Sequence, residues 1–485
     1  MWKRLLPSSL ALSAVLVSTV SSQHQNTTLL QHWKRANGST NHNDVWGMTT
    51  PDGKEYAIYG ERLGISILDA TNPSNLKQVG WFTAPGGSSV YTWRDYTNLG
   101  KFFYAVSEHY RGIRVFEMQA NGVPRDRGYV HTSTISSAHN IRCDPATGHL
   151  YVVGGNNRGL AIFDASQNPA NPRFVAIWNT SYVHDACIRR GKAYVCNGRA
   201  YQTRILDITN PTSISQIGTC RTQAGYNHAA WVSDDDKLLC VTDEIARNGV
   251  TPHMTVWDIS NPARPVKKGD YDPGGGAIAH NVFVIGRTAF LSYYIHGFHM
   301  VDLADPTRPT KVAGYSTSTV TTPGYYGAWG CFPFQDSGVV YVSDMQNGFY
   351  TIRVNCGHMN RFGAGTAGTN GVPRARFDGA TPRVGASKLR FEASGLEPNQ
   401  LFWVVGSAGP APTPTTLLGA EVNLDLARAV VIGPLPAGSD GTASLNSPIP
   451  NNPSLGNGRI YLQLFSHRGN GTLSSSRGMW AGICR

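Results

Sequence analysis

One short segment recurs along this chain and constrains its fold more than any other feature. The segment is a run of mostly apolar residues that ends, in six of its seven copies, in Asp or Glu. The copies end at positions 69, 117, 164, 207, 258, 302 and 353, so the intervals between them are 48, 47, 43, 51, 44 and 51 residues. A period in the forties with three or four strands per copy is typical of the blades of a β-propeller. The sequence therefore predicts an all-β chain that contains a seven-bladed β-propeller.

Turn signals separate the predicted strands. Five copies continue with an Asn-Pro or Asp-Pro pair, and these pairs begin at Asn72, Asn168, Asn210, Asn261 and Asp305. Proline cannot donate a hydrogen bond to a sheet and fixes its own φ, so we expect these pairs to form turns between strands. The outer strand of a blade should follow the turn, as at residues 266–271 and 311–315.

The repeated Ile-Leu-Asp or Val-Trp-Asp strand, followed by Ser or Thr and Asn-Pro, resembles the LVIVD repeat. The segments 43–47, 54–58 and 93–95 are similar to the secreted "choice-of-anchor B" branch of LVIVD-repeat proteins. The resemblance covers roughly residues 40–356. It implies a β-propeller at a cell exterior, and it implies no established reaction.

The N-terminal residues 1–22 have the composition of a signal peptide. Lys3 and Arg4 precede an apolar run at residues 10–20, and small residues lie before Gln23. The alternative, an N-terminal anchor helix, is disfavoured because a membrane span needs about 20 apolar residues. We expect a secreted, extracellular or periplasmic protein, attached to the cell surface or free, with no transmembrane span in the mature chain.

The rest of the chain divides by composition. Residues 23–40 are a polar, loose lead-in that could also complete the last blade, and the propeller takes up residues 41–356. Residues 357–380 are rich in Gly and predict a linker. From residue 381 to 485 the repeat ends, and four segments predict strands of a small C-terminal β-sandwich: residues 387–393, 401–405, 430–432 and 459–465.

The charge of the chain limits its partners. The net charge is +11, but it comes from basic residues that are scattered singly or in pairs. A protein that binds nucleic acid would gather them on one face, so we expect no nucleic-acid partner. A soluble, basic, secreted protein is the simplest interpretation, and weak attraction to acidic glycans or to a surface is the alternative. The expected partner is a protein or glycan at the cell exterior.

The chain contains eight cysteines, an even number that is compatible with disulfides. Cys356 and Cys484 bracket the C-terminal region and are the best candidate pair. Cys143, Cys187 and Cys331 lie on predicted first strands and could equally be small core residues. Sites for N-glycosylation, which matter only in a host that glycosylates, occur at Asn26, Asn37, Asn179 and Asn470.

Four consecutive blades begin with histidine. These residues are His139, His184, His228 and His280, and the intervals between them are 45, 44 and 52 residues, which match the blade period. The first strand of a blade lines the central channel, so the four imidazoles should lie at one level around the axis. Asp44, Asp95 and Trp329 occupy this place, or the one beside it, in the other blades.

Two interpretations of this histidine ring remain open. Each ring could hydrogen-bond to the backbone of a neighbouring blade, and the Asn or Asp that follows three of the histidines would belong to the same network. Alternatively, the four imidazoles could hold a transition metal such as Fe, Zn or Cu. Carotenoid cleavage oxygenases, which are seven-bladed propellers with four axial histidines on iron, offer an analogy of architecture only.

Carboxylates and aromatic residues provide further candidates. Glu108, Asp243, Glu244 and Asp344 end second strands, where they could support metal-ligating histidines or simply face solvent and turns. Aromatic side chains that could line a ligand groove, or pack between blades, are Tyr293, Tyr294, Tyr325, Tyr326 and Trp329.

Two functions are compatible with these features. The first is a secreted binding or scaffold protein, in which the propeller is a rigid platform and the C-terminal module serves attachment. The second is a metal-dependent oxidoreductase or hydrolase that uses the four axial histidines. The sequence carries no Gly-Xaa-Ser-Xaa-Gly elbow and no phosphate-binding loop. Because no catalytic signature is present, the first function is the favoured prediction.

Overall fold

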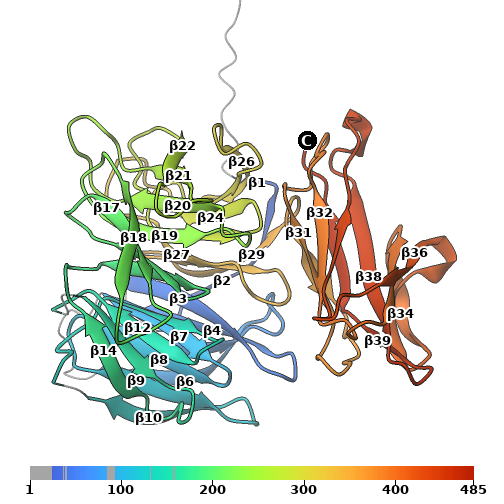
Figure 1. Ribbon diagram of the computed structural model, residues 1–485, viewed down its shortest axis with the longest axis horizontal. Coiled ribbons are helices and arrows are strands. Elements are labelled where there is room, and N and C mark those ends of the chain that lie inside the picture. The colour runs from blue at the N-terminus through green and yellow to red at the C-terminus, as the bar shows by residue number, and fades with distance from the viewer. Residues whose placement is uncertain (1–23, 37, 39–40, 85–92, 132, 157–158) are drawn as a thin grey trace, which may run out of the picture.

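The structure is a computed structural model that describes residues 24–36, 38, 41–84, 93–131, 133–156 and 159–485. Within these ranges the chain is all-β, without an α-helix. Two single turns of 3-10 helix occur, η1 (Leu426–Arg428) and η2 (Pro453–Leu455). The expected signal peptide lies outside the described residues. Figure 1 shows a large group of sheets, coloured blue to yellow, beside a smaller orange and red group.

Six sheets of the large group are meanders in which each strand pairs antiparallel with the next. Their strands, sheet by sheet, are β3 (His42–Thr49), β4 (Glu55–Glu61), β5 (Gly64–Asp69) and β6 (Lys77–Thr83); β7 (Arg94–Leu99), β8 (Phe102–Ser107), β9 (Ile113–Met118) and β10 (Pro124–Val130); β11 (Asn140–Asp144), β12 (His149–Val153), β13 (Leu160–Asp164) and β14 (Arg173–Trp178); β15 (Asp185–Arg189), β16 (Lys192–Cys196), β17 (Gln202–Asp207) and β18 (Ser215–Arg221); β19 (Asn227–Val232), β20 (Leu238–Asp243), β21 (Met254–Asp258) and β22 (Val266–Tyr271); β23 (Val282–Ile285), β24 (Thr288–Ser292), β25 (Phe298–Asp302) and β26 (Thr310–Tyr315).

A seventh sheet combines the two ends of this part of the chain. It contains β27 (Ala328–Phe332), β28 (Val340–Asp344) and β29 (Gly348–Val354), and its outer strand is β2 (Thr27–Trp33). The short strand β1 (His24–Gln25) pairs with β26 of the sheet before it. Of the two possibilities for these residues, a loose lead-in and a strand that completes the last blade, the second holds for β2. Pairing with β29 satisfies their backbone groups, which composition alone could not reveal.

The recurring third strand ends in the same way in sheet after sheet, which explains its sequence. The side chain of the terminal Asp accepts a hydrogen bond from the backbone N–H two residues later, as Asp69 does from Thr71 and Asp207 from Thr209. The following Asn or Asp repeats this contact within the turn, as in Asn210. Such side-chain turns are the reason that Asp, Asn and Pro punctuate the repeat.

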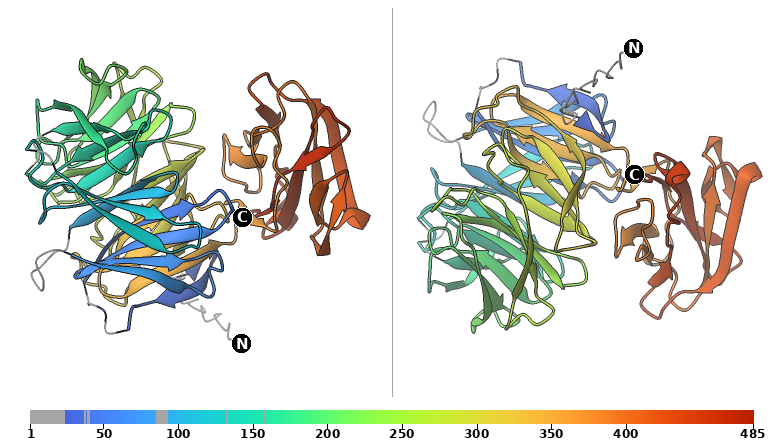
Figure 2. Two further views of the ribbon diagram at one scale, coloured as in Figure 1. Left: turned by 90° about the horizontal axis from the view of Figure 1, so that it is seen from below. Right: turned by 90° about the horizontal axis from the view of Figure 1, so that it is seen from above.

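The core of this region lies between neighbouring sheets. For example, Val153 and Ile162 of one sheet pack against Val195 and Leu206 of the next. The first strands contact one another in chain order from β3 to β23, and β27 of the last sheet contacts β3 of the first. Meander sheets that pack face to face around a shared axis, with their first strands innermost, make this part of the chain a β-propeller. Figure 2 shows the sheets from two opposite sides.

The C-terminal residues form three further sheets. Four of their strands lie where the sequence predicts them: β32 (Arg390–Ser394), β33 (Leu401–Ser407), β36 (Ala429–Pro436) and β38 (Arg459–His467). A six-stranded sheet contains β30 (Asn360–Phe362), β40 (Gly478–Gly482), β38 (Arg459–His467), β39 (Leu473–Ser475), β33 (Leu401–Ser407) and β36 (Ala429–Pro436). A three-stranded sheet contains β31 (Arg374–Asp378), β32 (Arg390–Ser394) and β37 (Ala443–Asn446), and a two-stranded one contains β34 (Pro410–Leu417) and β35 (Ala420–Leu424). Phe402 and Leu464 of the first sheet pack against Phe391 of the second.

The predicted Gly-rich linker is not a linker. Two of its segments are strands, because β30 pairs with β40 and β31 pairs with β32. The glycines lie at the turns between them, and Gly363, Gly371 and Gly379 have φ values of 64°, 86° and 75°. This left-handed conformation favours glycine. A Gly-rich composition therefore reflected tight turns rather than flexibility.

The cysteines follow the sequence analysis closely. A disulfide joins Cys356 to Cys484, the pair that the sequence favours. Cys187 and Cys331 are buried as free thiols, and Cys143 is half-buried. Of the candidate glycosylation sites, Asn179 and Asn470 are exposed, and Asn37 lies outside the described residues.

No helix in the described ranges is long and apolar enough to cross a membrane.

Candidate metal centre

The four predicted histidines come together at one end of the propeller axis. Each lies at the start of a first strand or just before it: His228 is the second residue of β19, and the other three lie one or two residues before β11, β15 and β23. Neighbouring rings are in contact around the axis: the ring centroids are 4.2 Å apart for His139 and His184, 4.5 Å for His184 and His228, and 4.2 Å for His228 and His280. Histidines at equivalent positions of successive repeats therefore lie next to one another in the structure.

The ligand atoms of this cluster lie close enough for a metal ion. They form two overlapping groups, one of His139, His184 and His228 and one of His228, His280 and Glu244, and within each group all the atoms lie within 4.8 Å of one another. Two nitrogens on one ion, each bonded at about 2.0–2.1 Å, can be at most about 4.2 Å apart. Three ligands around one ion must lie closer still, at about 3.6 Å from one another or less, so the side chains of either group would have to move inward to bind an ion.

One nitrogen of three of the rings is already occupied. Nδ1 of His139 lies 2.8 Å from a carboxylate oxygen of Glu108, and the Tyr226 hydroxyl lies 3.1 Å from Nδ1 of His184. Nδ1 of His280 donates to the backbone carbonyl of Trp329 at 2.5 Å. Of these three contacts, only the last is the bond to a neighbouring blade's backbone that a structural role predicts. Each contact leaves Nε2 as the free nitrogen.

The free nitrogens have no partner in the described part of the chain. Nε2 of His184, Nε2 of His280 and Nδ1 of His228 are all buried without a hydrogen bond. A cavity of about 10 Å³ is lined by the four rings and also by Asp44, Asp95, Asp185 and their neighbours. That volume suits a single water molecule or ion. Leaving one buried polar group without a partner costs about 1–3 kcal/mol, so an occupant that bonds to these nitrogens would stabilise the fold.

A carboxylate joins the cluster from the end of β20. The oxygens of Glu244 lie 3.8 Å from Nε2 of His228 and 3.7 Å from Nε2 of His280. The Tyr294 hydroxyl donates at 2.9 Å to Oε1 of Glu244, the oxygen that also faces His280. Burial raises the pKa of Glu244 to about 7. Glu244 and Glu108 are the two strand-end carboxylates that contact the histidines.

Burial also sets the charge of the rings. It lowers the pKa of His184, His228 and His280 well below the ordinary value, so these imidazoles are neutral. Burial opposes the charged form of His139 as well, but the hydrogen bond and charge of Glu108 outweigh it and raise the pKa of that ring. Neutral imidazole is the form that binds a metal.

A second layer of polar side chains lies against the histidines. It holds Asp44, Asp95 and Asp185, and the guanidinium of Arg142 lies among them. Arg142 contacts Asp95 at 2.6 Å and Asp185 at 3.3 Å. Asn281 donates to Asp44 at 3.3 Å. Burial and the neighbouring Asp95 raise the pKa of Asp44 well above its usual range. Asp44 and Asp95, which the sequence placed beside the axis, thus belong to this layer and not to the histidine cluster.

The remaining predicted candidates lie elsewhere. Asp243 accepts a hydrogen bond from Thr222, on the connection between β18 and β19, and Asp344 accepts backbone N–H groups from its own turn. Tyr293 is packed in the core and does not line a groove. Tyr325 and Tyr326 are 46% and 47% exposed at the surface.

Trp329 is buried in the axial ring itself. It stacks on Trp93, with the ring centroids 4.6 Å apart, and lies 4.3 Å from the ring of His280. Together, the two Trp rings continue the ring of aromatic side chains where the blades lack a histidine.

Sequence reasoning missed the residues that orient and support the cluster. Tyr226 and Trp93 carry no repeat signal. Arg142 could have been found, because it follows Asn140 by two residues and strand side chains repeat their direction every second residue. The same rule does not identify which carboxylates it meets, since these come from three different blades.

Comparison with known proteins supports the repeat architecture. The LVIVD repeat matches residues 193–222 and 250–273, which correspond to β16–β18 and to β21 with β22. Among solved structures, the chain is similar to the hydrazine synthase of Kuenenia stuttgartiensis, with 12% sequence identity and a TM-score of 0.49 over 67% of this chain and 99% of that chain. No curated protein matches the sequence. The chain therefore carries LVIVD repeats within its β-propeller.

Proposed function

We propose that the histidine cluster is a transition-metal centre and that the chain is a metal-dependent enzyme. The observation that carries this proposal is the set of three buried, unpaired ring nitrogens, on histidines that all line one cavity. Metal-ligating histidines normally donate their other nitrogen to a carboxylate, a carbonyl or another polar group. Glu108, Tyr226 and the carbonyl of Trp329 fill these roles.

The donor set limits the metal and its chemistry. Three imidazoles, or two imidazoles with a carboxylate, suit Fe, Zn or Cu, and they do not suit Ca²⁺ or Mg²⁺, which prefer oxygen ligands. Iron or copper would support an oxidoreductase, whereas zinc would support a hydrolase. A substrate would approach from the side of His139 and Glu108, whose side chains are 14% and 29% exposed, because the other rings are sealed.

Elemental analysis of the purified protein tests this proposal directly. We expect close to one equivalent of Fe, Zn or Cu. His228→Ala should abolish binding, because His228 belongs to both ligand groups. His253→Ala is the matched control, since this ring contacts Asp270 and Thr251 and lies outside both groups. Metal that is absent from the native protein, and that does not bind when Fe²⁺, Zn²⁺ or Cu²⁺ is added, would overturn the proposal.

The architecture that carries the centre can be stated more finely. We infer seven blades within residues 41–356, closed by β2 on the last sheet, and a β-sandwich within residues 381–485. The seven sheets, the contact of β27 with β3 and the shared core of the two larger C-terminal sheets support this. The segments similar to the "choice-of-anchor B" branch lie on β3, on β4 and at the start of β7, and we propose membership of that branch.

We also propose that the protein is secreted. The apolar segment before Gln23, the disulfide and the exposed glycosylation sites support an exported chain. Expression in a host that secretes proteins tests this. The mature N-terminus should begin at or near Gln23, and Asn179 and Asn470 should be modified if that host glycosylates. A chain that remains inside the cell with its first residues intact would contradict secretion.

A binding role at a surface is the second candidate, and one observation favours it. The edge strand β36 exposes Val430, Val431 and Ile432 by 68%, 59% and 53%. Exposed apolar edge strands are suited to pairing with another chain. Val431→Lys should release the protein from the cell surface, whereas Val123→Lys, at an exposed position on the propeller, should not. Equal retention of both variants would argue against attachment through β36.

A further inference from the structure

The opposite end of the propeller axis carries a second site. The first strands run from the histidines toward a hollow of about 510 Å³ that is lined by their later residues. Trp46, Trp231 and Phe332 come from three different blades and form its apolar floor. Arg142 lies at its base, so the Arg142–aspartate layer separates this hollow from the histidine cluster.

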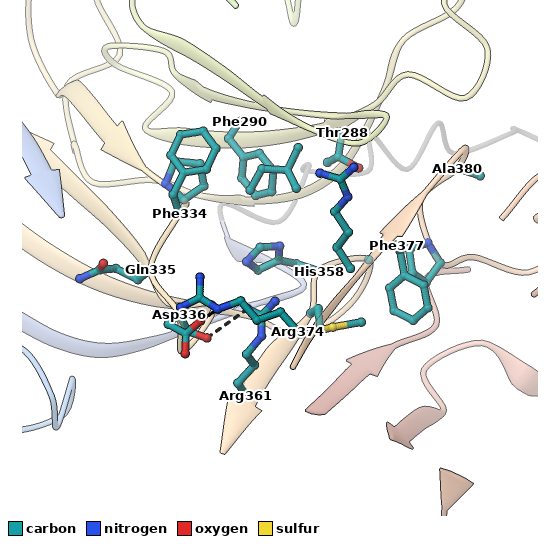
Figure 3. A pocket seen from close by; sticks show the side chains of 16 residues that line it. Thr288, Phe290, Phe334, Gln335, Asp336, His358, Arg361, Arg374, Phe377 and Ala380 are labelled. Atoms are coloured by element: carbon teal, nitrogen blue, oxygen red, sulfur yellow. Dashed lines mark hydrogen bonds and ion pairs between the residues drawn. The ribbon is translucent and has the colours of Figure 1, made fainter. Parts of the chain in front are cut away.

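A smaller hollow of about 190 Å³ adjoins the first one, between the propeller and the C-terminal sheets. The two hollows share four lining residues, so they form one continuous groove, and these residues are Phe334, Gln335, Asp336 and Arg374. Figure 3 shows the smaller hollow, with Phe290 and Phe334 along one side and Asp336, Arg361 and Arg374 along the other. The groove therefore has an aromatic end and a cationic end.

Positive charge is in excess at the cationic end. Three arginines and one aspartate line the smaller hollow, and the arginines are Arg361, Arg374 and Arg376. Arg374 and Arg477 share Asp336, at 3.7 Å and 3.2 Å. Because one carboxylate serves two arginines here, neither guanidinium is fully neutralised.

Arg361 has no carboxylate partner in the described residues. It donates to the backbone carbonyls of Asp336 and Ala375, and its buried Nε has no hydrogen bond. The neighbouring His358 is buried, and its Nε2 is also unpaired. A buried guanidinium held only by carbonyls retains its full charge and attracts an anion.

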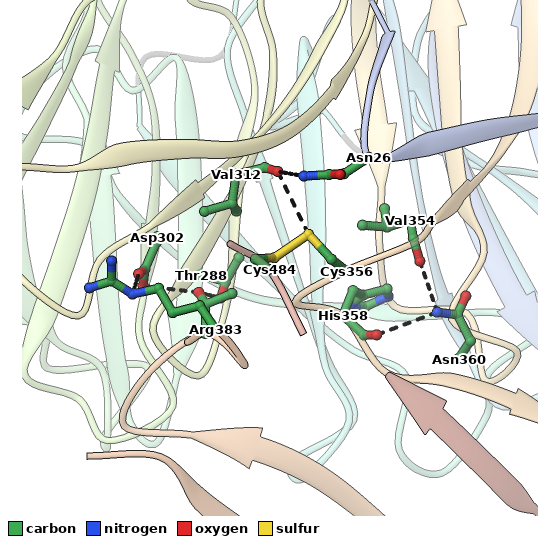
Figure 4. The surroundings of a disulfide bond; sticks show 11 residues. Asn26, Thr288, Asp302, Val312, Val354, Cys356, His358, Asn360, Arg383 and Cys484 are labelled. Carbon is green, nitrogen blue, oxygen red and sulfur yellow. Dashed lines mark hydrogen bonds and ion pairs between the residues drawn. A yellow bond between two sulfur atoms is a disulfide. The ribbon is translucent and has the colours of Figure 1, made fainter. Parts of the chain in front are cut away.

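The groove is held in a fixed shape. Its cationic residues come from β30 and β31, and the disulfide between Cys356 and Cys484 anchors the start of this segment to the end of the chain. Figure 4 shows Arg383 beside this disulfide, where it contacts Asp302 of the propeller at 3.0 Å. Arg376 reaches Asp234 of the propeller at 2.9 Å. A rigid groove reduces the entropy cost of ordering a ligand.

We propose that this groove binds an acidic oligosaccharide that carries uronic acid residues. The planar faces of Trp46, Trp231 and Phe334 suit the apolar faces of sugar rings, and planar guanidinium groups pair with carboxylates through two parallel hydrogen bonds. The larger hollow alone has a volume of about 510 Å³, which is within the range of small-molecule sites. The net charge of +11 adds a long-range attraction for a polyanion.

Calorimetric titration with trigalacturonic acid tests the proposal, and its methyl ester is the neutral match. We expect the acid to bind, and the ester to bind at least tenfold more weakly. Raising the salt concentration should weaken the binding of the acid. No binding of the acid at millimolar concentration, or equal affinities for acid and ester, would overturn the proposal.

Variants then place the ligand in the groove. Arg374→Gln should weaken acid binding about tenfold, because it removes a charge-assisted hydrogen bond, and Phe334→Ala should weaken acid and ester alike. Arg308→Gln is the matched control, since this side chain is 86% exposed on the turn between β25 and β26. A loss of affinity that is equal in Arg374→Gln and Arg308→Gln would reveal non-specific charge attraction and overturn the assignment. His228→Ala should bind the acid normally, because the two sites are separate.

Discussion

Two layers of buried polar side chains lie side by side on the propeller axis, and they differ in one respect. The aspartate layer contains its own cation, because Arg142 extends into it and contacts Asp95 and Asp185. In the histidine layer the carboxylates of Glu108 and Glu244 face imidazole nitrogens instead of a guanidinium. Both layers keep buried polar atoms without a hydrogen bond: Asp95 Oδ1 and Arg142 Nε in the first, and three ring nitrogens in the second. Both layers are built from the same first strands.

The difference separates a structural polar cluster from a binding site. A buried charge is tolerated when its counter-charge is built into the chain, as in the aspartate layer. In the histidine layer Glu108 and Tyr226 orient His139 and His184, and all four rings line a small cavity that also borders the aspartate layer. The chain thus orients nitrogen atoms that can act as metal ligands, but three of them make no hydrogen bond within the described residues. This arrangement is typical of a metal-binding site.

Replacing Arg142, the cation of the aspartate layer, should have the largest effect on stability. We expect Arg142→Gln to lower the free energy of unfolding by about 3–5 kcal/mol, because it leaves buried carboxylates without a partner. Urea unfolding of the propeller, followed by tryptophan fluorescence, measures the change. The triple variant Arg142→Gln, Asp95→Asn, Asp185→Asn should recover part of the loss, because the charges disappear together. Unchanged stability of the single variant would show that the two layers do not differ in this way.

Adding or removing the metal ion of the histidine layer should have the next largest effect on stability. A bound metal stabilises the folded state by about 4 kcal/mol when its free concentration is a thousand times Kd. Removal of the metal with dipicolinate should therefore lower the unfolding temperature, and re-addition should restore it. The same treatment should leave His228→Ala unchanged. If the chelator destabilises both proteins equally, the stabilising ion lies outside the histidine layer.

The fold could be predicted from sequence because each blade repeats local signals. The Asp that ends the third strand and the Asn-Pro turn are local features, and they correctly placed β5, β13, β17, β21 and β25. Pairing between distant segments was harder. The polar β2 shows no apolar alternation, and only its position beside β29 makes it a strand. Likewise, β30 and β31 are strands because they pair with β40 and β32, whereas the glycines around them led to the prediction of a linker.

The site could be predicted only as far as the repeat period reaches. The spacing of His139, His184, His228 and His280 was sufficient to bring the rings together, because equivalent positions in a propeller meet at the axis. Tyr226 lies on a loop before its strand, and no period marks it. Whether a strand-end carboxylate turns toward the axis, as Glu244 does, or into its own turn, as Asp344 does, depends on side-chain direction that sequence does not encode locally.

A buried histidine outside the cluster sharpens the comparison through its pH dependence. His42 on β3 is buried, stacks on Tyr59, and has two unpaired ring nitrogens. Burial, together with the nearby Lys34, His32 and Arg35, lowers its pKa to about 4. The unfolded chain binds a proton near pH 6.5 that the folded chain does not bind.

The contribution of neutral His42 to the free energy of unfolding should therefore be fully present above pH 6.5. It should fall by as much as about 3 kcal/mol as the pH drops toward 4. His42→Phe should remove this part of the acid dependence, measured as the difference between unfolding curves at pH 7 and pH 4.5. Because His42 lies outside both groups of metal-ligand atoms, metal should not alter its contribution. An unchanged pH dependence in His42→Phe would show that another group controls the acid transition.

The smallest expected effect is the most specific to the histidine layer. Tyr226→Phe removes the nearer of the two hydroxyls that contact Nδ1 of His184, at 3.1 Å, and leaves that of Tyr182 at 3.3 Å. Loss of such an orienting contact typically weakens metal binding 10–100-fold. Competition with a chromogenic chelator measures the change, and Tyr201→Phe, on the loop before β17 and outside the cluster, is the control. A structural histidine layer predicts instead that Tyr226→Phe alters only stability, because no ion depends on the tautomer of His184. Metal affinity that falls while the unfolding temperature of the metal-free protein stays constant would distinguish a prepared site from a packed one.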